Sequence, residues 1–224
     1  MSDLYTIIPA AGQSRRFKDA GYETPKPLLQ LKRPDGVIAS MVSHVRRSVP
    51  GYVTVGFPVG SKVPSDLISS VVFIKETTGQ ADTVYQMIRR LPNKTSVLIL
   101  DCDMVIQRSD IEQVIKFLDV YDTVLAVTET FDPNSSRVNT VPFPTQFAEK
   151  EPISQWGIVS VRAFKRADDL STVLKTVLDN SKNAEPYLSQ ALKYLHGTKY
   201  AHIITEYVDL GTPERIIEAG WEIV

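Results

Sequence analysis

Cysteine and histidine are scarce in this sequence, which excludes several kinds of chemistry. The 224 residues include one cysteine, Cys102, and three scattered histidines, His44, His196 and His202. A single cysteine cannot form an internal disulfide, and no Cys/His cluster has zinc-ligand spacing. The histidines have no serine, cysteine or aspartate partner in a recognisable motif, so no nucleophilic triad is expected. This usage favours a reducing compartment, and we predict a cytoplasmic protein.

Long apolar runs and an excess of charge of either sign are absent as well. Nowhere do about 18 consecutive apolar residues occur, and residues 1–5 lack a basic region ahead of an apolar run. The 25 Lys and Arg residues against 26 Asp and Glu leave a formal net charge of -1. We therefore expect neither secretion nor a membrane span nor a nucleic acid partner, and any phosphate ligand must be bound by local groups.

Short apolar runs rich in β-branched residues alternate with segments of helical spacing. The runs, which predict buried strands, lie at residues 5–8, 53–55, 71–74, 97–100 and 124–127. The helical segments lie at 38–49, 84–91, 109–118, 170–178 and 188–195, with capping-box spacing at Ser109 and Glu112. Between them, the Pro-containing stretch 133–152 predicts a loop or edge hairpin, and regular patterning returns at 157–164.

This alternation predicts an α/β fold. We expect three layers, a mostly parallel sheet with helices on both faces, and ligands at the carboxyl ends of the strands. Hydrophobic residues make up 43% and charged residues 23%, as in ordinary globular proteins, so we predict a single domain over residues 1–224. Residues 1–130 would form its nucleotide-binding half and residues 131–224 its acceptor-binding half.

A turn of small residues with two arginines follows the first predicted strand. It contains Ala10, Ala11, Gly12, Gln13, Ser14, Arg15 and Arg16. Backbone N–H groups in such a turn can converge on phosphate oxygens, and an arginine adds fixed charge. The sequence has neither the P-loop pattern nor the three-glycine dinucleotide fingerprint. The alternative interpretation is a tight strand-to-helix turn whose arginines are solvated.

A lysine between two prolines follows within reach of this turn. Pro25, Lys26 and Pro27 are consecutive. Because a residue before proline is pushed toward extended conformations, we expect Lys26 to be non-helical and held in a fixed geometry.

Two aspartates come directly after the strand predicted at residues 97–100. Asp101 and Asp103 are two positions apart, and Mg²⁺ prefers oxygen ligands of which one or two are protein carboxylates. The alternative interpretation is a solvated turn, where aspartate is common.

Residues 7–29 resemble the signature of the sugar-phosphate nucleotidylyltransferases and related cytidylyltransferases, through the Ala-Ala-Gly turn, Arg16-Phe17 and Pro25-Lys26-Pro27. The resemblance implies a Rossmann-like, GT-A-like nucleotide-diphospho-sugar transferase fold. It implies that residues 10–15 bind the nucleotide, that Arg16 grips the β- and γ-phosphates, and that Lys26 holds the α-phosphate. Most members have glycine where this chain has Ser14, although the related molybdenum-cofactor nucleotidyltransferases tolerate serine there.

The same resemblance implies a metal site built from distant residues. It makes Asp103 one metal ligand, and Asp209 in the segment 207–214 the other, with Mg²⁺ as the ion and Mn²⁺ as an alternative. Asp101 would be a nucleotide-binding residue. It would either lie next to the metal ligands without binding the metal itself, or contact the sugar. Thr212 can also cap a helix opened by Pro213, which leaves Asp209 free.

Base and acceptor residues are implied by looser motifs. The base would lie at Gly79 and Gln80, where a loop capped by Asp82 or Thr83 is the alternative interpretation. Glu149 would bind acceptor hydroxyls and Lys150 the acceptor phosphate, although such a charge run is also typical of a solvated turn. Gly157 would approach the acceptor, and the family often has another residue in place of its neighbour Trp156.

We therefore predict a nucleotidyltransferase that joins a nucleoside triphosphate (NTP) to a phosphorylated small molecule and releases pyrophosphate. The first expectation for the acceptor is a sugar 1-phosphate, which implies sugar nucleotide and polysaccharide biosynthesis, and a phosphorylated alcohol, amino acid or choline-like compound is the alternative. The rival functions are a GT-A-type glycosyltransferase that consumes a nucleotide sugar and a non-catalytic nucleotide-binding regulatory module. The sequence leaves the nucleotide and the oligomeric state open, and it is compatible with a homo-oligomer.

Overall fold

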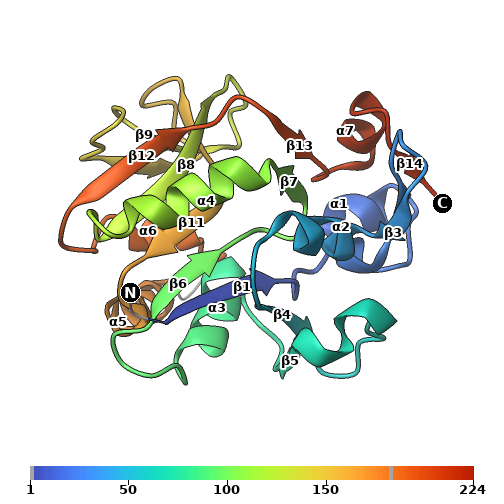
Figure 1. The fold of residues 1–224 in the computed structure, drawn as a ribbon, viewed down its shortest axis with the longest axis horizontal. Coiled ribbons are helices and arrows are strands. Elements are labelled where there is room, and N and C mark those ends of the chain that lie inside the picture. Colours follow the sequence, from blue (N-terminus) through green and yellow to red (C-terminus); the bar gives the residue numbers. More distant parts are fainter. Residues whose placement is uncertain (1–2, 182–183) are drawn as a thin grey trace.

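A nine-stranded sheet forms the centre of the computed structural model, which describes residues 3–181 and 184–224 (Figure 1). The strands are β1 (Leu4–Pro9), β4 (Val53–Pro58), β5 (Val71–Ile74), β6 (Ser96–Ile99), β8 (Thr123–Glu129), β9 (Ser136–Val138), β10 (Phe147–Glu149), β11 (Trp156–Phe164) and β12 (Lys199–Ile203). Their order is β10-β9-β11-β6-β1-β4-β5, with β8 paired to β11 and β12 paired to β8.

The sheet contains both parallel and antiparallel strand pairs, and the antiparallel pairs are centred on β11. Strands β6, β1, β4 and β5 are parallel neighbours, as are β8 and β12. The long strand β11 runs antiparallel to β6, β8 and β9, and its register shifts between Ile158 and Arg162. This irregularity bends the strand and lets it serve three neighbours.

Helices cover both faces of the sheet. One face packs against α3 (Gln80–Ile88), α5 (Ala167–Asn180) and α6 (Leu188–Ala191), and the other against α2 (Met41–Ser48) and α4 (Arg108–Phe117). Each helix turns an apolar stripe toward the sheet, and the two resulting cores are separated by the strands. The predicted three-layer α/β fold is confirmed, whereas the division into two functional halves stays a prediction.

A third, smaller core joins the two ends of the chain. Its buried members are Phe17, Leu29, Leu31, Met41, Leu210, Ile216 and Trp221. Around it lie α1 (Arg15–Asp19), η1 (Lys26–Leu28), α7 (Pro213–Glu218) and a sheet of β2 (Gln30–Lys32), β3 (Ile38–Ser40) and β14 (Glu222–Ile223). A separate pair, β7 (Met104–Ile106) and β13 (Tyr207–Asp209), brings the C-terminal segment beside the end of β6. One further 3₁₀ helix, η2 (Ser65–Ser70), precedes β5.

The five predicted strands and the predicted hairpin are confirmed, and three helix boundaries are corrected. The helix expected over 38–49 begins only at Met41, because residues 38–40 pair with β2 as a strand. The segment expected to be helical over 188–195 is an α-helix only over α6. The capping box is wrong: α4 begins at Arg108, and the Glu112 carboxylate accepts a hydrogen bond from Arg108 Nε at 2.9 Å instead.

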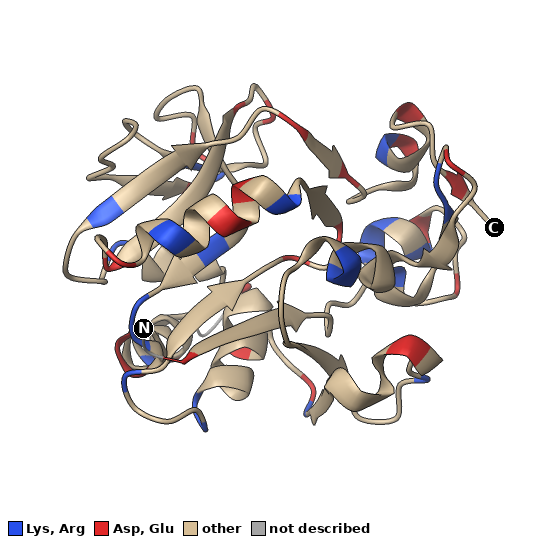
Figure 2. Cartoon of the chain, viewed as in Figure 1, with Lys and Arg blue, Asp and Glu red and all other residues tan. Residues whose placement is uncertain are grey.

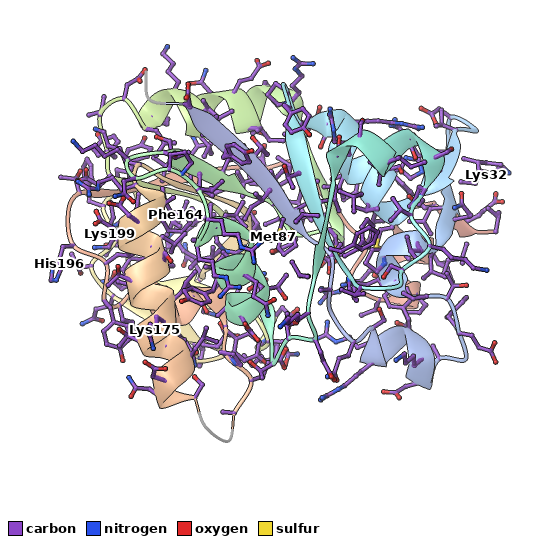
Figure 3. The ribbon with its side chains drawn as sticks, turned by 90° about the horizontal axis from the view of Figure 1, so that it is seen from below. Lys32, Met87, Phe164, Lys175, His196 and Lys199 are labelled. Atoms are coloured by element: carbon purple, nitrogen blue, oxygen red, sulfur yellow. The ribbon has the colours of Figure 1, made fainter. Side chains whose placement is uncertain are left out.

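Charged residues are distributed over many elements on both sides of the sheet (Figure 2), which fits the near-zero net charge. Met87 lies inside, against the sheet, whereas Lys32 and His196 lie at opposite edges of the molecule (Figure 3). Within residues 3–181 and 184–224, none of the helices has the length and apolar character needed to cross a membrane.

Candidate active site

The turn after β1 presents its backbone and its arginines to solvent. Ala10 is buried and its N–H bonds to the carbonyl of Gly56 at 2.9 Å, which fixes the start of the turn. Around Gly12, no atom lies within 4 Å of the place where a side chain would begin, so its backbone is open to a ligand. Arg15 is exposed and bonds through Nε to the Gln13 side chain at 2.9 Å. The backbone and the arginines of this turn are therefore accessible to solvent.

The left-handed residue of this turn is Ser14, with φ 56° and ψ 30°. This is the position at which the resembling family usually has glycine, and glycine is the residue that adopts such a conformation without steric cost. The Ser14 hydroxyl accepts a hydrogen bond from the Lys26 N–H at 2.9 Å. The serine thus ties the arginine turn to the lysine turn.

Lys26 is the first residue of η1, which is one turn of 3₁₀ helix. The expectation that Lys26 is non-helical is therefore wrong. Pro27 fits the second position of this turn because the N–H that proline lacks has no partner there. The turn closes through a bond from the Leu29 N–H to the Lys26 carbonyl at 3.2 Å. Proline restricts the lysine as expected, but to a tight turn and not to an extended segment.

The Lys26 ammonium group pairs with Asp103 beyond the end of β6. Nζ lies 2.6 Å from Asp103 Oδ2, and about a fifth to a quarter of each side chain is exposed. Burial works to lower the pKa of Lys26, but the facing Asp103 carboxylate outweighs it and the pKa lies above its ordinary value. Burial likewise works to raise the pKa of Asp103, and Lys26, with a contribution from Arg16, holds it below the ordinary value. Both groups are therefore charged at neutral pH.

Asp209 meets Asp103 across the β7–β13 pair. Asp209 stands opposite Met104, and the Leu210 N–H bonds to the Asp103 carbonyl at 2.7 Å. A side chain at Gly211 would begin 2.9 Å from Asp209 Oδ1 and 3.6 Å from Asp103 Oδ2. The two carboxylate oxygens thus face one small space that the glycine keeps open.

These two carboxylates fit a hard divalent cation. No group of three or more His, Cys, Asp or Glu side chains is arranged to hold a metal within the described residues. Mg²⁺ usually takes only one or two protein carboxylates and fills its other positions with water and substrate phosphate. Asp103 and Asp209 are therefore the residues that could hold it, with Lys26 and the exposed Arg16 at the same place.

Asp101 is hydrogen-bonded to Gln80 and Arg162. Its carboxylate accepts bonds from Gln80 Nε2 at 2.5 Å and from Arg162 Nη1 at 3.1 Å, and its N–H bonds to the Ser160 hydroxyl at 2.9 Å. Burial and the nearby Asp103 raise the pKa of Asp101 and Arg162 opposes them, with a net upward shift. Asp101 thus links Gln80 at the start of α3 to Arg162 of β11, and its expected place on the nucleotide side stays a prediction.

Cys102, between the two aspartates, is a free thiol in the interior. It is buried, and burial raises the pKa of its thiol to about 12. The thiol is therefore protonated at neutral pH, and it belongs to the core on the face of the sheet that α2 and α4 cover.

Gln80 opens α3 and follows Gly79 directly, so the alternative of a loop capped by Asp82 or Thr83 is wrong. A side chain at Gly79 would begin 2.9 Å from atoms of Glu185 and Pro186, so glycine is required for the close approach of these segments. Asp82 instead accepts a bond at 3.0 Å from the N–H of Thr78, which precedes it in the chain, whereas a cap would accept from an N–H two or three residues after it.

Two of the predicted acceptor residues, Glu149 and Lys150, make their contacts with residues other than Lys26, Asp103 and Asp209. Glu149 accepts hydrogen bonds from the hydroxyls of Ser136 and Ser189. Lys150 Nζ bonds to Tyr187 Oη at 2.6 Å. None of the hydrogen bonds or ion pairs found in residues 3–181 and 184–224 joins Glu149 or Lys150 to Lys26, Asp103 or Asp209.

Gly157, the third predicted acceptor residue, packs against the loop after β8. A side chain there would begin 2.3 Å from the Thr130 methyl group. Gly157 also lines a cavity of about 580 Å³ together with Thr128, Thr130, Ser135, Asp209 and Arg215. The cavity adjoins the space between Asp103 and Asp209, and it has the size of a small-molecule site.

Three charged residues of this region were missed at the sequence level. Arg162 is buried in β11 against Asp101, and Arg215 pairs with both Asp209 and Asp132. An arginine inside an apolar strand segment was a usable signal for Arg162. Nothing in the local pattern distinguished Arg215 or Asp132 from ordinary surface charges.

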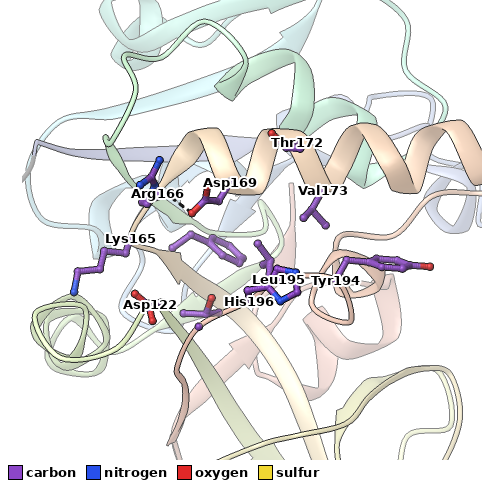
Figure 4. A pocket seen from close by; sticks show the side chains of 12 residues that line it. Asp122, Lys165, Arg166, Asp169, Thr172, Val173, Tyr194, Leu195 and His196 are labelled. Carbon is purple, nitrogen blue, oxygen red and sulfur yellow. Dashed lines mark ion pairs between the residues drawn. The ribbon is translucent and has the colours of Figure 1, made fainter.

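A second cavity, of about 420 Å³, lies at the start of α5, away from these residues (Figure 4). Arg166 and Asp169 form an ion pair beside it. It contains none of the predicted site residues.

Comparison with known proteins agrees with the fold. Residues 6–178 match the family described as MobA-like NTP transferase domain. A nucleoside-diphosphate-sugar pyrophosphorylase from Vibrio cholerae RC9 is similar with a TM-score of 0.77 and 18% identity, over 96% of this chain and 98% of that one. UDP-glucose pyrophosphorylase from Acinetobacter baumannii has a TM-score of 0.73 and 15% identity, over 98% and 92%. The inositol-1-phosphate CTP transferase from T. maritima has a TM-score of 0.70 and 12% identity, over 96% and 92%. The comparison with curated proteins found no match.

Proposed function

Since the chain belongs to the family of MobA-like NTP transferase domains and is an enzyme of the nucleotidyltransferase type, we propose that it transfers a nucleoside monophosphate from an NTP to a phosphorylated small molecule. Its first acceptor class is a sugar 1-phosphate. The names of two structural neighbours, a nucleoside-diphosphate-sugar pyrophosphorylase and a UDP-glucose pyrophosphorylase, support that class. The second acceptor class is a phosphorylated alcohol, which the name of a third structural neighbour, the inositol-1-phosphate CTP transferase, supports.

One observation carries the proposal: Lys26, Asp103 and Asp209, from three distant parts of the chain, meet at the carboxyl end of the parallel strands. This is where ligands bind in open α/β sheets. A lysine facing two acidic groups around an open space is suited to a polyphosphate and its cation.

In the proposed reaction, an oxygen of the acceptor phosphate attacks the α-phosphorus. A new P–O bond forms, the bond between the α-phosphorus and the oxygen bridging to the β-phosphate breaks, and pyrophosphate leaves. Because the attacking group is already an anion, no residue has to act as a general base. The barrier must then fall mainly through positioning and charge neutralisation.

The chain's own residues supply both effects. Lys26 neutralises charge at the α-phosphate, where its contact with Asp103 is exchanged for one with the substrate. Arg16, on the exposed side of the turn, binds the β- and γ-phosphates of the leaving group. A divalent cation held by Asp103 and Asp209 would add charge stabilisation between the phosphates.

The experiment is a pyrophosphate-release assay with each of the four NTPs and Mg²⁺ against a panel of sugar 1-phosphates, inositol 1-phosphate, phosphocholine and phosphoserine. We expect release that requires both an NTP and one phosphorylated acceptor. Consumption of a nucleotide sugar without pyrophosphate would identify a glycosyltransferase instead. Tight NTP binding without product over the whole panel would identify a regulatory binding module.

A further inference from the structure

Arg215, in the first turn of α7, connects two carboxylates that are far apart in sequence. Its Nη1 bonds to Asp209 Oδ2, and its Nη2 lies 2.5 Å from Asp132 Oδ2. Asp132 belongs to the loop after β8, 83 positions from Arg215. The guanidinium thus links the C-terminal segment that carries Asp209 to a loop of the central sheet.

The two oxygens of Asp209 have different tasks. Oδ1 accepts a bond from the Gly211 N–H at 2.7 Å and faces the space shared with Asp103. Oδ2 is the oxygen held by Arg215. Arg215 therefore fixes the carboxylate by the oxygen that is not directed at Asp103.

Asp132 divides its oxygens in the same way. Oδ1 accepts a bond from the Asn134 N–H at 2.8 Å within its own turn, and Oδ2 faces Arg215. The loop itself is clamped by Arg137, which is buried and donates to the carbonyls of Thr130 and Asp132, each at 2.8 Å. Asp132 is therefore a rigid anchor for the guanidinium.

We propose that Asp132 and Arg215 are positioning residues that hold the Asp209 carboxylate in its metal-binding orientation. This inference rests on the proposed function, since it assumes that Asp209 holds the cation. All three side chains line the cavity of about 580 Å³, so the same ion pairs also set one wall of the space beside the reacting phosphates.

Stability alone does not account for this arrangement. The three side chains are 25 to 37% exposed, and ion pairs with such exposure typically contribute only about 0–1 kcal/mol. Orientation is a larger effect: a planar guanidinium shared between two carboxylates fixes direction as well as distance. Residues that hold a metal ligand in place typically change metal affinity by about 10–100-fold when replaced.

The test measures Mn²⁺ affinity by electron paramagnetic resonance of free Mn²⁺, in a buffer without phosphate or pyrophosphate, because these anions would bind Mn²⁺ in solution. We expect Asp132→Asn and Arg215→Lys each to weaken Mn²⁺ binding by about 10–100-fold. Because both act through Asp209, the double variant should be no weaker than the weaker single variant. In an Asp209→Asn background, Asp132→Asn should have no further effect.

The control is Arg166→Lys, which alters a comparable arginine–aspartate pair at the start of α5 and should leave Mn²⁺ affinity unchanged. Unchanged Mn²⁺ affinity in Asp132→Asn, or losses that multiply in the double variant, would overturn the positioning role. Circular dichroism shows whether Asp132→Asn folds normally. If it does not, the Mn²⁺ affinity of Arg215→Lys is compared with that of the unaltered protein instead. If Asp209→Asn binds Mn²⁺ as tightly as the unaltered protein, the metal assignment of the proposed function fails instead.

Discussion

At the scale of single residues, Ser14 has an unfavourable backbone conformation but makes a hydrogen bond that glycine could not make. A non-glycine residue in the left-handed region costs about 1–2 kcal/mol, yet the Ser14 hydroxyl holds the Lys26 N–H. The resembling family's usual glycine would avoid the cost but could not make this contact. Ser14 thus connects the turn after β1 directly to η1.

Ser14→Ala and Ser14→Gly should therefore differ in stability but not in turnover. Both lose the bond to Lys26, which should lower kcat about tenfold or more through misplacement of the lysine. Only glycine also relieves the left-handed strain, so we expect it to be about 1 kcal/mol more stable than the alanine variant. Urea unfolding and pyrophosphate release measure the two effects, with the exposed Ser69→Ala as control. Equal stability of the two Ser14 variants would contradict the strain argument.

Lys26 should matter for turnover much more than for folding. Its ammonium group is the cation that faces Asp103, and loss of one such preorganised group typically costs on the order of 10²–10³ in kcat. We expect Lys26→Ala to keep its circular dichroism spectrum and lose turnover by that factor in a pyrophosphate-release assay. Lys32→Ala, which removes a surface pair with Glu222, should keep normal turnover. An unchanged kcat in Lys26→Ala would remove this lysine from the mechanism.

At the scale of elements, His44 connects α2 to β2 and to the C-terminal segment. Its Nε2 lies 3.0 Å from the Leu31 carbonyl, and its ring packs edge-on against Trp221 with centroids 4.8 Å apart. Nδ1 is buried and has no hydrogen-bond partner among residues 3–181 and 184–224. Burial lowers the pKa of His44 although the bond to Leu31 opposes this. The neutral ring, donating through Nε2, is therefore the folded form.

Acidification should destabilise the protein through His44. Because its pKa is lower in the folded than in the unfolded state, the unfolded chain takes up the proton first as the pH falls below about 6.5. Stability is thus full above that value and falls by up to about 1.4 kcal/mol per pH unit below it, until the folded-state pKa is reached. Urea unfolding at pH 8.0 and 5.5 should show a larger loss for the unaltered protein than for His44→Gln. Equal losses would mean that His44 does not titrate differently on folding.

The elements that the sequence predicts well are those whose pattern is local. Examples are the β-branched run at residues 97–100 and the amphipathic helix α5. Their apolar spacing indicates a strand or a helix whatever its neighbours in the fold are. The three-residue strands β7 and β13 could not be predicted, because they are too short for any periodicity and depend on pairing with each other. Their pairing is nevertheless what brings Asp209 beside Asp103.

At the scale of the whole molecule, the site depends on contacts between distant segments. The sequence pattern singled out Lys26 and Asp103, whereas Asp209 and the separate roles of all three came from the resemblance, and these roles stay predictions. Their proximity results from the strand order and from a C-terminal segment that returns to the first 41 residues. The bridge from Asp132 to Arg215 spans 83 positions, and no local pattern signals a contact of that separation.

This return of the C-terminal segment should be a large contribution to stability, and Trp221 tests it. Trp221 is 6% exposed in the core shared by the two chain ends, so Trp221→Ala should cost about 3–5 kcal/mol through the cavity that it leaves. For a protein of this size, that corresponds to a Tm lower by roughly 2–4 °C for each kcal/mol. Urea unfolding followed by circular dichroism measures the loss, with the 92% exposed Phe131→Ala as the aromatic control. The C-terminal segment shares a core with residues from the beginning of the chain. We therefore expect it to unfold together with the sheet, in a single transition. A loss below about 1 kcal/mol, or a separate early transition, would show that this segment is not part of the cooperative core.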